Sequence, residues 1–336
     1  MNKTSVFNIT GTTTVEFETL DSVLAHWQPD ATGVAWNCLF VLPLWLKAWW
    51  NNFGQDEDLY LISVRHEHRT VGIAPLVRNT RSARLMGDQN VCDNLDFIVA
   101  PGLTAEFYST LFHQLRQDGI ARLELGLIRP DSSAYTELLP QAEKLGCRVH
   151  CEPAATSYEL ELPETWNAYL EGLSGRERHE IRRKLRRLKK AGRVNFRLVD
   201  DRILAAREME TFLKLFKSNR PDKAAFMSDK MGAFFRDLAI HLAAHGLLKL
   251  YFLELDEKPI AAVMCFDYLS TRYLYNNGYD SRYSTLSAGL LSKVLSIKES
   301  FQTGIKTYDF LKGSEAYKQR LGGQPISLYQ CLLEIT

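Results

Sequence analysis

Helical and alternating hydrophobic patterns follow one another along the chain, which predicts a mixed α/β fold. In the first half, WLKAWWNNFG has helical spacing after Pro43, and LYLISVRHEHRTVGIAPLVR predicts two strands around a polar turn. Residues 106–118 predict a helix, ARLELGLI a strand, the segment after Asp131 a helix and CRVHCE another strand. The stretch EPAATSYELELPETW is expected to be a connection that leads to a second unit.

The second unit has a similar order of elements and opens with a cation-rich helix, SGRERHEIRRKLRRLKKAG. In this helix Ile181, Leu185 and Leu188 form one apolar stripe, which must dock on a core. The elements predicted after it are the strand FRLV, helices at residues 203–217 and 231–245, the strands LLKLYFLEL, KPIAAVMCFDYL and RYLYNNGYD, a helix at residues 286–303 and the strand KTYDFL.

Two similar phrases indicate that the halves could be copies of one fold. VRHEHRTVGIAPLV and LELDEKPIAAVMCF each contain a strand, a charged turn and a second strand that opens on Val or Ile. The alternative is a chance likeness of two β-hairpins. A chain of 336 residues is long enough for two domains of ordinary size. We therefore predict an α/β (α+β) fold of two lobes, at residues 1–155 and 156–336, each with a mixed sheet flanked by helices.

The composition is that of a globular chain, because 46% of the residues are hydrophobic and 11% aromatic. The first residues, MNKTSVFNITGTTT, lack the apolar segment of a signal peptide, and no stretch is long enough for a membrane helix. We therefore expect a cytoplasmic protein without an integral membrane segment. The six cysteines have no CxxC spacing and are expected to be reduced thiols. Cys147, His150 and Cys151 lie close together but lack a second ligand pair, so we expect no metal.

Positive charge is concentrated in one place. The chain has 41 Lys and Arg and 40 Asp and Glu, yet residues 176–193 hold ten Lys or Arg against two Glu. A nucleic-acid-binding protein usually spreads its basic residues over a domain, whereas a pocket for a few phosphates needs only one patch. The helix is therefore either a solvated face whose long side chains cover apolar neighbours, or a site for phosphate or an acidic ligand. In the second case Arg182, Arg183 and Arg186 are the candidate ligand-binding residues.

The start of the helix near Leu286 is a second candidate site for phosphate. A strand ends at Tyr279, and a polar loop leads to the small residues Ser287, Ala288 and Gly289. A helix N-terminus presents free N–H groups and the positive end of the helix dipole, and small residues allow close approach of a ligand. The alternative is that these small residues serve packing.

The order of elements, together with YD…YS…SAGLL and YDFLKGSEAYK, resembles the GNAT-type acetyltransferase fold, specifically the CelD-like acetyltransferase domain family. That family is similar to the Fem-type aminoacyltransferases. The resemblance covers residues 176–321, and LPLWLKAWW and VGIAPLV resemble the first lobe of such two-lobed proteins. It implies two tandem GNAT-like lobes, which would explain the repeated phrase.

The resemblance also implies where a donor would bind. The strands at residues 273–279 and 307–311 would splay apart around the acyl-thioester arm, and the segment from Asp280 to the start of the next helix would hold the pyrophosphate, with Ser287, Ala288, Gly289, Arg182 and Arg186 as donor-binding residues. The usual R/Q-x-x-G-x-G/A loop is absent, because STLSAG has a single glycine. The resemblance implies acetyl-CoA or another acyl-CoA as the donor, and the departure from the usual loop leaves other phosphate-bearing donors open.

The segment DFLKGSEAYK supplies the catalytic groups that the resemblance implies. Lys318 resembles a Lys that Fem-type enzymes use near the reacting carbonyl, where a cation would stabilise the developing oxyanion. Asp309 or Glu315 could accept the proton of an attacking amine, and Tyr279, Tyr283 or Tyr317 could return one to the leaving group. The expected substrate-binding residues are Tyr279, Asp280, Gly313 and Glu315.

We therefore expect an N-acyltransferase that moves an acyl group from acyl-CoA to an amine of a sugar, a peptide or a cell-envelope precursor by direct attack. No GxSxG, HExxH, Walker loop or GxGxxG occurs, and direct transfer needs none of them. One alternative uses aminoacyl-tRNA, whose phosphates the basic helix would bind. Fem-type proteins commonly carry a coiled-coil insertion, and the absence of a heptad run here favours acyl-CoA. Another alternative is a non-catalytic ligand-binding module.

Overall fold

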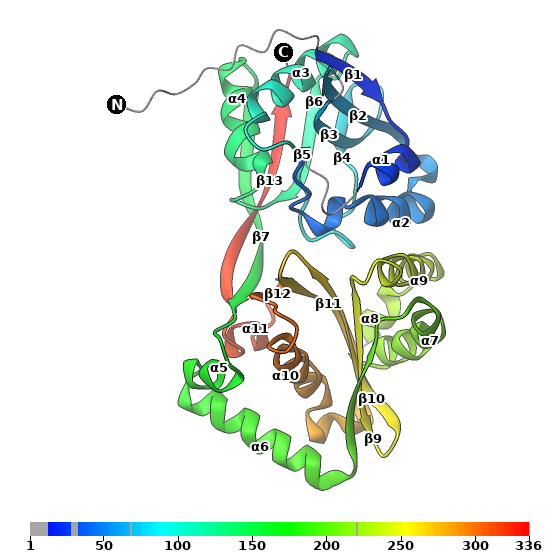
Figure 1. Ribbon diagram of the computed structural model, residues 1–336, viewed down its shortest axis with the longest axis vertical. Coiled ribbons are helices and arrows are strands. Elements are labelled where there is room, and N and C mark those ends of the chain that lie inside the picture. The colour runs from blue at the N-terminus through cyan, green and yellow to red at the C-terminus, as the bar shows by residue number, and fades with distance from the viewer. Residues whose placement is uncertain (1–12, 28–32, 68, 220, 336) are drawn as a thin grey trace. The chain divides into compact units, whose positions relative to one another are not determined.

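The computed structural model describes residues 13–27, 33–67, 69–219 and 221–335, and the chain divides into two compact units (Figure 1). The first unit comprises the described residues within Met1–Leu46, Asp56–Pro153 and Tyr329–Thr336. The second unit comprises Lys47–Gln55 and the described residues of Ala154–Leu328. The predicted lobes at 1–155 and 156–336 differ from these units in three places: the boundary lies after Pro153, the C-terminal strand returns to the first unit from Tyr329, and the segment Lys47–Gln55 joins the second. Residues 1–12, in which no signal peptide pattern was found, lie outside the described residues.

The first unit is a mixed sheet with helices around it. Its strands are hydrogen-bonded in the order β1-β2-β3-β4-β6-β13-β7, with β5 paired to β3. The strands are β1 (Thr13–Phe17), β2 (Asp58–His66), β3 (Arg69–Arg78), β4 (Ser82–Leu85), β5 (Ile98–Val99), β6 (Arg122–Ile128), β7 (Arg148–Glu161) and β13 (Gln324–Glu334). The helices are α1 (Leu20–His26), α2 (Pro43–Phe53), α3 (Thr104–Gln117) and α4 (Leu139–Lys144), with short turns η1 (Leu39–Val41), η2 (Gly54–Asp56) and η3 (Ala134–Leu138).

The second unit has strands in the order β7-β12-β11-β10-β9-β8. Helix α10 covers one face of this sheet, and α7 and α9 cover the other (Figure 1). The strands are β8 (Val194–Val199), β9 (Leu248–Leu255), β10 (Lys258–Tyr268), β11 (Thr271–Tyr279) and β12 (Thr307–Lys312). The helices are α5 (Trp166–Gly172), α6 (Gly175–Ala191), α7 (Arg202–Asn219), α8 (Pro221–Phe226), α9 (Asp229–Ala243), α10 (Ala288–Ser300) and α11 (Tyr317–Arg320), with η4 (Ser281–Leu286) before α10.

The predicted α/β fold and its internal repeat are confirmed. The two similar phrases form the hairpins β2–β3 and β9–β10, and each hairpin lies beside a strand, β4 or β11, that pairs in parallel with the next one. The stripe of the basic helix also docks as predicted, because Ile181 and Leu188 are buried and Leu185 packs against the same core.

Other predictions are wrong. The expected connection after CRVHCE is instead a continuation of β7 to Glu161, and β1, β4 and β13 were not predicted. Pro153 lies inside β7, where a proline ordinarily indicates a break, because it cannot donate to a ladder. The burial of β7 also follows no strict alternation, so the sequence carries little strand signal there.

The prediction of six reduced thiols is wrong for two cysteines. Cys151 on β7 and Cys331 on β13 form a disulfide, with Cα atoms 4.1 Å apart. The two strands are neighbours in the sheet, but the cysteines are 180 residues apart in sequence, so no local spacing indicates the pair. The other four cysteines are free and buried.

A buried ion pair fixes α10 against the sheet of the second unit. Arg272 on β11 is fully buried and donates to both carboxylate oxygens of Asp267, each at 2.7 Å. It also donates to the carbonyl of Ser296 on α10 at 3.1 Å. Within the described part of the chain, no helix is both long and apolar enough to cross a membrane.

Candidate functional site

Two parallel strands of the second unit part after a short ladder. β11 and β12 pair only from Thr271 opposite Thr307 to Tyr273 opposite Asp309, although β11 continues to Tyr279. On its other side β12 has a register shift against β7 between Asp309 and Leu311. Leu311 has a φ of 60°, a conformation that costs a branched residue energy and needs support from its surroundings. The splay that the resemblance implied for these strands is therefore present.

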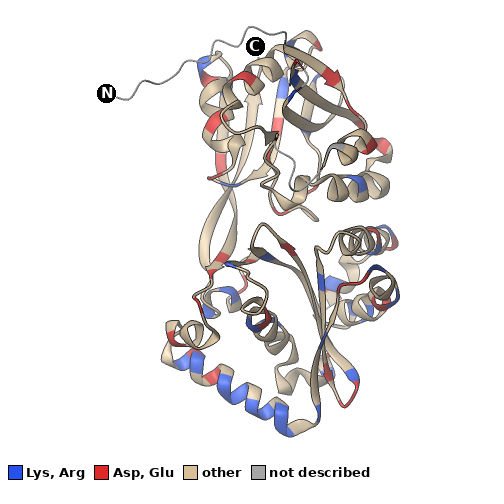
Figure 2. Ribbon diagram, in the orientation of Figure 1, with Lys and Arg blue, Asp and Glu red and all other residues tan. Residues whose placement is uncertain are grey.

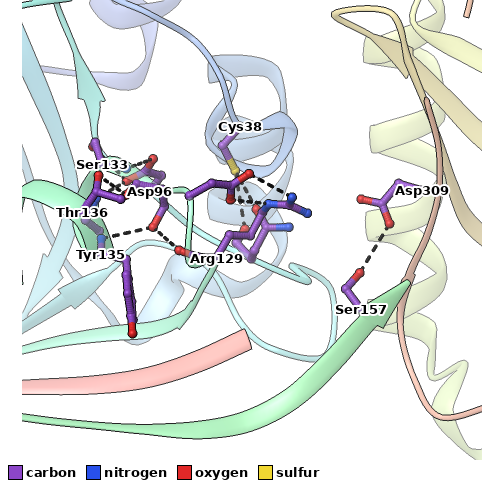
Figure 3. A network of polar contacts seen from close by, with 12 residues as sticks. Cys38, Asp96, Arg129, Ser133, Tyr135, Thr136, Ser157 and Asp309 are labelled. Carbon is purple, nitrogen blue, oxygen red and sulfur yellow. Dashed lines mark hydrogen bonds and ion pairs between the residues drawn. The ribbon is translucent and has the colours of Figure 1, made fainter. Parts of the chain in front are cut away.

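Asp309 supports this bulge. Its side chain is buried, and Oδ1 accepts hydrogen bonds from the backbone N–H of Leu311 at 2.7 Å and from Ser157 Oγ at 3.4 Å (Figure 3). The carboxylate thus satisfies the backbone at the point where the ladder to β11 ends. This position makes Asp309 a structural acceptor and also places a carboxylate at the point of divergence.

Lys318 is buried and its ammonium is already engaged. Nζ donates to the carbonyl oxygens of Leu311 at 2.9 Å and Lys312 at 2.6 Å, and lies 3.3 Å from Oε2 of Glu315. An ammonium has three donors, and these three partners match them. Burial raises the pKa of Glu315, but the charge of Lys318 outweighs this and leaves that pKa below its ordinary value. The described arrangement therefore ties α11 to the bulged end of β12.

Gly313 makes this arrangement possible. It has a φ of 129°, and a Cβ there would lie 2.4 Å from Oε2 of Glu315 and 3.0 Å from Nζ of Lys318. The predicted site residues Gly313, Glu315 and Lys318 are thus brought together in one turn, as the sequence motif indicated.

A cavity of about 550 Å³ lies between α6, α10 and α11. This volume falls in the range of roughly 300–1,000 Å³ that is typical of small-molecule sites. Its apolar lining includes Leu290 and Leu321, and its charged lining consists of Arg176, Lys184, Arg320, Glu177 and Glu180. Lys184 forms an ion pair with Glu180 at 3.5 Å, which leaves Arg176 and Arg320 against Glu177, so the cavity favours an anionic ligand.

Tyr317 is the member of the predicted catalytic set that lines this cavity. Burial raises the pKa of its hydroxyl, so the hydroxyl stays protonated at neutral pH and can donate a proton or a hydrogen bond. Tyr283 instead packs, partly buried, against the apolar cluster around Leu291.

The basic helix presents different cations to the cavity than the sequence predicted. Arg182 and Arg186 are exposed, and neither lines the cavity. Arg183 forms an ion pair with Glu180 at 2.8 Å. The cavity-lining cations of α6 are Arg176 and Lys184 (Figure 2 shows the basic residues along α6). The sequence thus indicates the helix but not which of its faces borders the cavity.

The loop before α10 is held by its own capping contacts. Asp280 Oδ1 accepts a hydrogen bond from the backbone N–H of Arg282 at 3.0 Å. The carboxylate of Asp280 also forms an ion pair with the guanidinium of Arg282 at 2.6 Å. The hydrogen bond from Arg282 lowers the pKa of Asp280. Ser287 follows with a φ of 59°, and its hydroxyl lies 3.3 Å from Nη2 of Arg187 on α6. A cation therefore stands beside the start of α10.

The small residues at the start of α10 serve packing, which is the alternative that the sequence left open. A Cβ on Gly289 would lie 2.4 Å from Cδ1 of Tyr279, so the tyrosine ring covers the glycine backbone. Ala288 is fully buried in the apolar cluster between α6 and the sheet. Of the three predicted residues, Ser287 is the one whose side chain meets a basic group.

Sequence reasoning missed Lys293 on α10. Its side chain is buried, donates to the carbonyl of Gly289 at 2.7 Å and lies 4.6 Å from the ring centroid of Tyr317. Burial, with the nearby charge of Lys223, lowers the pKa of Lys293 to about 7. A lysine inside the apolar run LLSKVLSI is the signal that could have indicated it.

Two units, each with a short parallel ladder between two of its strands, define a tandem α/β fold. Residues 175–319 match the family model of the acetyltransferase (GNAT) domain. The matched segment lies within the second unit, so the acetyltransferase (GNAT) domain that the family model describes is found there.

Solved structures share the fold across nearly the whole chain. The structure of FemX has 12% identity and a TM-score of 0.65, and the alignment covers 96% of this chain and 97% of that one. A conserved protein of unknown function from Bacteroides thetaiotaomicron has 11% identity and a TM-score of 0.56, with 95% and 99% covered. L-PGS from Bacillus licheniformis has 11% identity and a TM-score of 0.55, with 87% and 90% covered. No curated protein matches this sequence.

Proposed function

We propose that the protein is an N-acyltransferase of the CelD-like group whose second unit takes acyl-CoA, acetyl-CoA first, as donor. The observation that carries the proposal is the parting of β11 and β12 within the GNAT-matched segment, and a cavity between α6, α10 and α11 whose lining holds more cations than carboxylates supports it. The proposed acceptor is an amine of a sugar, a peptide or a cell-envelope precursor, and the proposed location is cytoplasmic. No metal is part of the proposed reaction.

The proposed reaction is a direct attack on the thioester. The amine nitrogen forms a bond to the carbonyl carbon, the bond from carbon to sulfur breaks, and the departing thiolate takes a proton. Tyr317 is the proposed donor of that proton, because it lines the cavity and its hydroxyl is protonated at neutral pH. Asp309 and Glu315 stay the proposed acceptors of the amine proton, and Lys293 joins them because it titrates near neutral pH.

The cavity cations are proposed to bind the donor phosphates. Calorimetric titration of acetyl-CoA tests this with two double variants of the same helix. Arg176→Gln with Lys184→Gln removes charges that line the cavity, whereas Arg182→Gln with Arg186→Gln removes charges of the same helix that lie outside it. We expect the first pair to weaken binding by about tenfold or more and to flatten its salt dependence, and the second to change it little. Equal effects of the two pairs, or no binding by the wild type, would overturn the proposal.

A second candidate function uses aminoacyl-tRNA as donor. The observation in its favour is a row of exposed cations on α6 that lie outside the cavity and form no ion pair with any described residue: Arg182, Arg186, Lys189 and Lys190. A polyanion longer than CoA could contact them, and its binding would depend strongly on salt.

The same variants separate the two donors. If tRNA is the donor, a filter-binding assay should show tRNA retained by the wild type and lost in Arg182→Gln with Arg186→Gln, while acetyl-CoA fails to bind. If the wild type binds acetyl-CoA and shows no preference for charged tRNA over other RNA, acyl-CoA stays the donor. Binding of a donor without transfer to any amine would favour a non-catalytic binding module.

A further inference from the structure

The first unit also has a short parallel ladder, between β4 and β6. Beyond the end of this ladder, another segment of the first unit bonds to the free edge of β6. β4 and β6 pair in parallel over three residues, from Ser82 opposite Arg122 to Arg84 opposite Glu124. β4 ends one residue later, whereas β6 continues to Ile128. Beyond the ladder, the N–H of Leu95 donates to the carbonyl of Leu127 at 2.8 Å.

The side chain of Leu95 completes this closure. It is 6% exposed, and its Cδ1 lies 3.5 Å from where a Cβ of Gly126 would stand. Gly126 has a φ of 63°, so the strand bends around the leucine. The edge of β6 that would have to receive an acyl chain is therefore taken by the protein itself, and the first unit does not repeat the donor site proposed for the second.

The first unit has instead a cavity of about 350 Å³ near the end of β6 and the start of α3. Its volume suits a small molecule. Its lining includes the hydrogen-bonding side chains of Asn37, Asn94, Thr104, Thr136, Asp131 and Glu137. Apolar groups, including Val99 and Pro101, complete the wall.

The wall of this cavity is rigidly built around Asp96. Its buried carboxylate accepts from the backbone N–H groups of Ser133 and Ala134, both at 2.9 Å, and from the hydroxyl of Ser133 at 3.1 Å (Figure 3). These bonds join the segment before α3 to the turn after β6. All are internal, so Asp96 holds the cavity in shape rather than offering a free ligand group.

Asn94 offers a ligand group that the protein does not use. Its side chain is 94% buried, with 6% exposed, and lines the cavity. Cys38 Sγ donates to Oδ1 of Asn94 at 3.3 Å, and burial keeps the pKa of the Cys38 thiol well above its ordinary value, so the thiol stays a donor. The Nδ2 donors of Asn94 have no hydrogen-bond partner among the described residues. A hydroxyl oxygen of a ligand would satisfy them.

The charged side chains of the cavity lining determine whether the cavity favours a positively or a negatively charged ligand. Arg129 is bonded to both oxygens of Asp131, at 2.9 and 3.1 Å, and is neutralised by it. Glu137 is exposed at the rim and has no ion pair with any described residue. Because burial raises the pKa of Asp96 and Asp131 is paired with Arg129, Glu137 is the carboxylate of the lining that favours a cation over an anion.

We propose that this cavity binds a small hydroxylated ammonium compound of the amino sugar class. The amide and hydroxyl side chains match the hydroxyl groups, Glu137 matches the ammonium, and the apolar wall matches the C–H face of a sugar ring. The proposal concerns the first unit alone and holds whether the second unit uses acyl-CoA or tRNA.

Titration of the full chain with three sugars tests this. By calorimetry or saturation-transfer NMR, D-glucosamine should bind about tenfold or more tightly than D-glucose, which lacks the amine, and N-acetyl-D-glucosamine, which lacks its charge. Glu137→Gln should weaken glucosamine binding severalfold, whereas Glu143→Gln, an exposed glutamate outside the cavity, should leave it unchanged.

A second variant keeps the test decisive. Asn37 is exposed in a loop, so Asn37→Trp should fold normally and fill the cavity mouth, and it should abolish binding. Failure of the wild type to bind glucosamine at millimolar concentration, equal binding of the three sugars, or unchanged binding in Asn37→Trp would each overturn the proposal.

Discussion

At the scale of single residues, Lys318 holds the site together through bonds that leave its ammonium no spare donor. Lys318→Met would leave two buried carbonyls, those of Leu311 and Lys312, without their partner. We expect the free energy of unfolding to fall by about 3 kcal/mol, measured by urea denaturation. Lys306→Met, at an exposed position, is the matched control and should change it little.

The opposite outcome for Lys318 is equally informative. If Lys318→Met folds with unchanged stability and its kcat falls about a hundredfold, the lysine acts on the oxyanion, as the resemblance implied. The hydrogen bonds of Lys318 to the carbonyls of Leu311 and Lys312 would then be replaced by a bond to the oxyanion during the reaction.

Lys293 should give the protein a pH-dependent stability of a particular sign. Its pKa is about 7 in the folded protein against an ordinary value of 10.5. Between these values the unfolded chain binds the proton and the folded one does not, so the free energy of unfolding rises with pH. The penalty for burying the charge is fully present below about pH 7 and is relieved as the pH rises towards 10.5.

Lys293→Met removes this penalty. We expect the variant to gain stability over the wild type at about pH 7 and to gain clearly less at about pH 9, by urea denaturation at both values. Lys298→Met on the exposed side of α10 should show no such pH-dependent difference. A gain that is the same at both pH values would contradict the lowered pKa.

At the scale of elements, the start of α10 is fixed by contact between a glycine and an aromatic ring. Gly289→Ala would place a Cβ 2.4 Å from Tyr279, which requires the ring or the helix to move. We expect a loss of about 1–3 kcal/mol in the free energy of unfolding. In a double-mutant cycle, Tyr279→Ala should relieve most of this loss, and strictly additive effects would show that the two residues do not couple.

The elements with strong periodicity could be predicted from the sequence, and those shaped by tertiary contacts could not. The stripe of Ile181, Leu185 and Leu188 indicated both the helix and its docking. β13 and the long β7 owe their length to pairing with strands distant in sequence, and Pro153 masks the second of them.

The residues of the candidate site also divide into those that the sequence could predict and those that it could not. The motif DFLKGSEAYK placed Gly313, Glu315 and Lys318 in one turn, because they are close in sequence. Which face of α6 borders the cavity depends on how the helix docks on α10 and α11, and the stripe alone does not give it. Lys293 escaped notice because a single lysine in an apolar helix resembles an exposed one until its burial is known.

At the scale of the whole molecule, each unit has its own short parallel ladder between two strands, and the units differ in what lies next to that ladder. The second unit has a cavity between α6, α10 and α11 that is lined by more cations than carboxylates, and the first has a closed edge and a cavity with more carboxylates than cations. In the proposals made above, the second unit binds the donor and the first unit binds a separate ligand.

The disulfide joins β7 and β13, and each of these two strands contributes residues to both units. It closes a loop of 180 residues, so reduction should lower the free energy of unfolding by about 2–5 kcal/mol. Urea denaturation with and without a reductant measures this, and Cys331→Ser should make the protein insensitive to the reductant. Thiol counting in denaturant should give four free cysteines without reduction, and a count of six would contradict the pair.

The central claim is that the cavity between α6, α10 and α11 holds the acyl donor. Hydrogen–deuterium exchange of the full chain, with and without acetyl-CoA, tests it most directly because it needs no acceptor and reports on every segment. We predict slower exchange in α6, in the first turns of α10 and in α11, where the cavity-lining residues lie. No change, or protection confined to the cavity of the first unit, would contradict the claim.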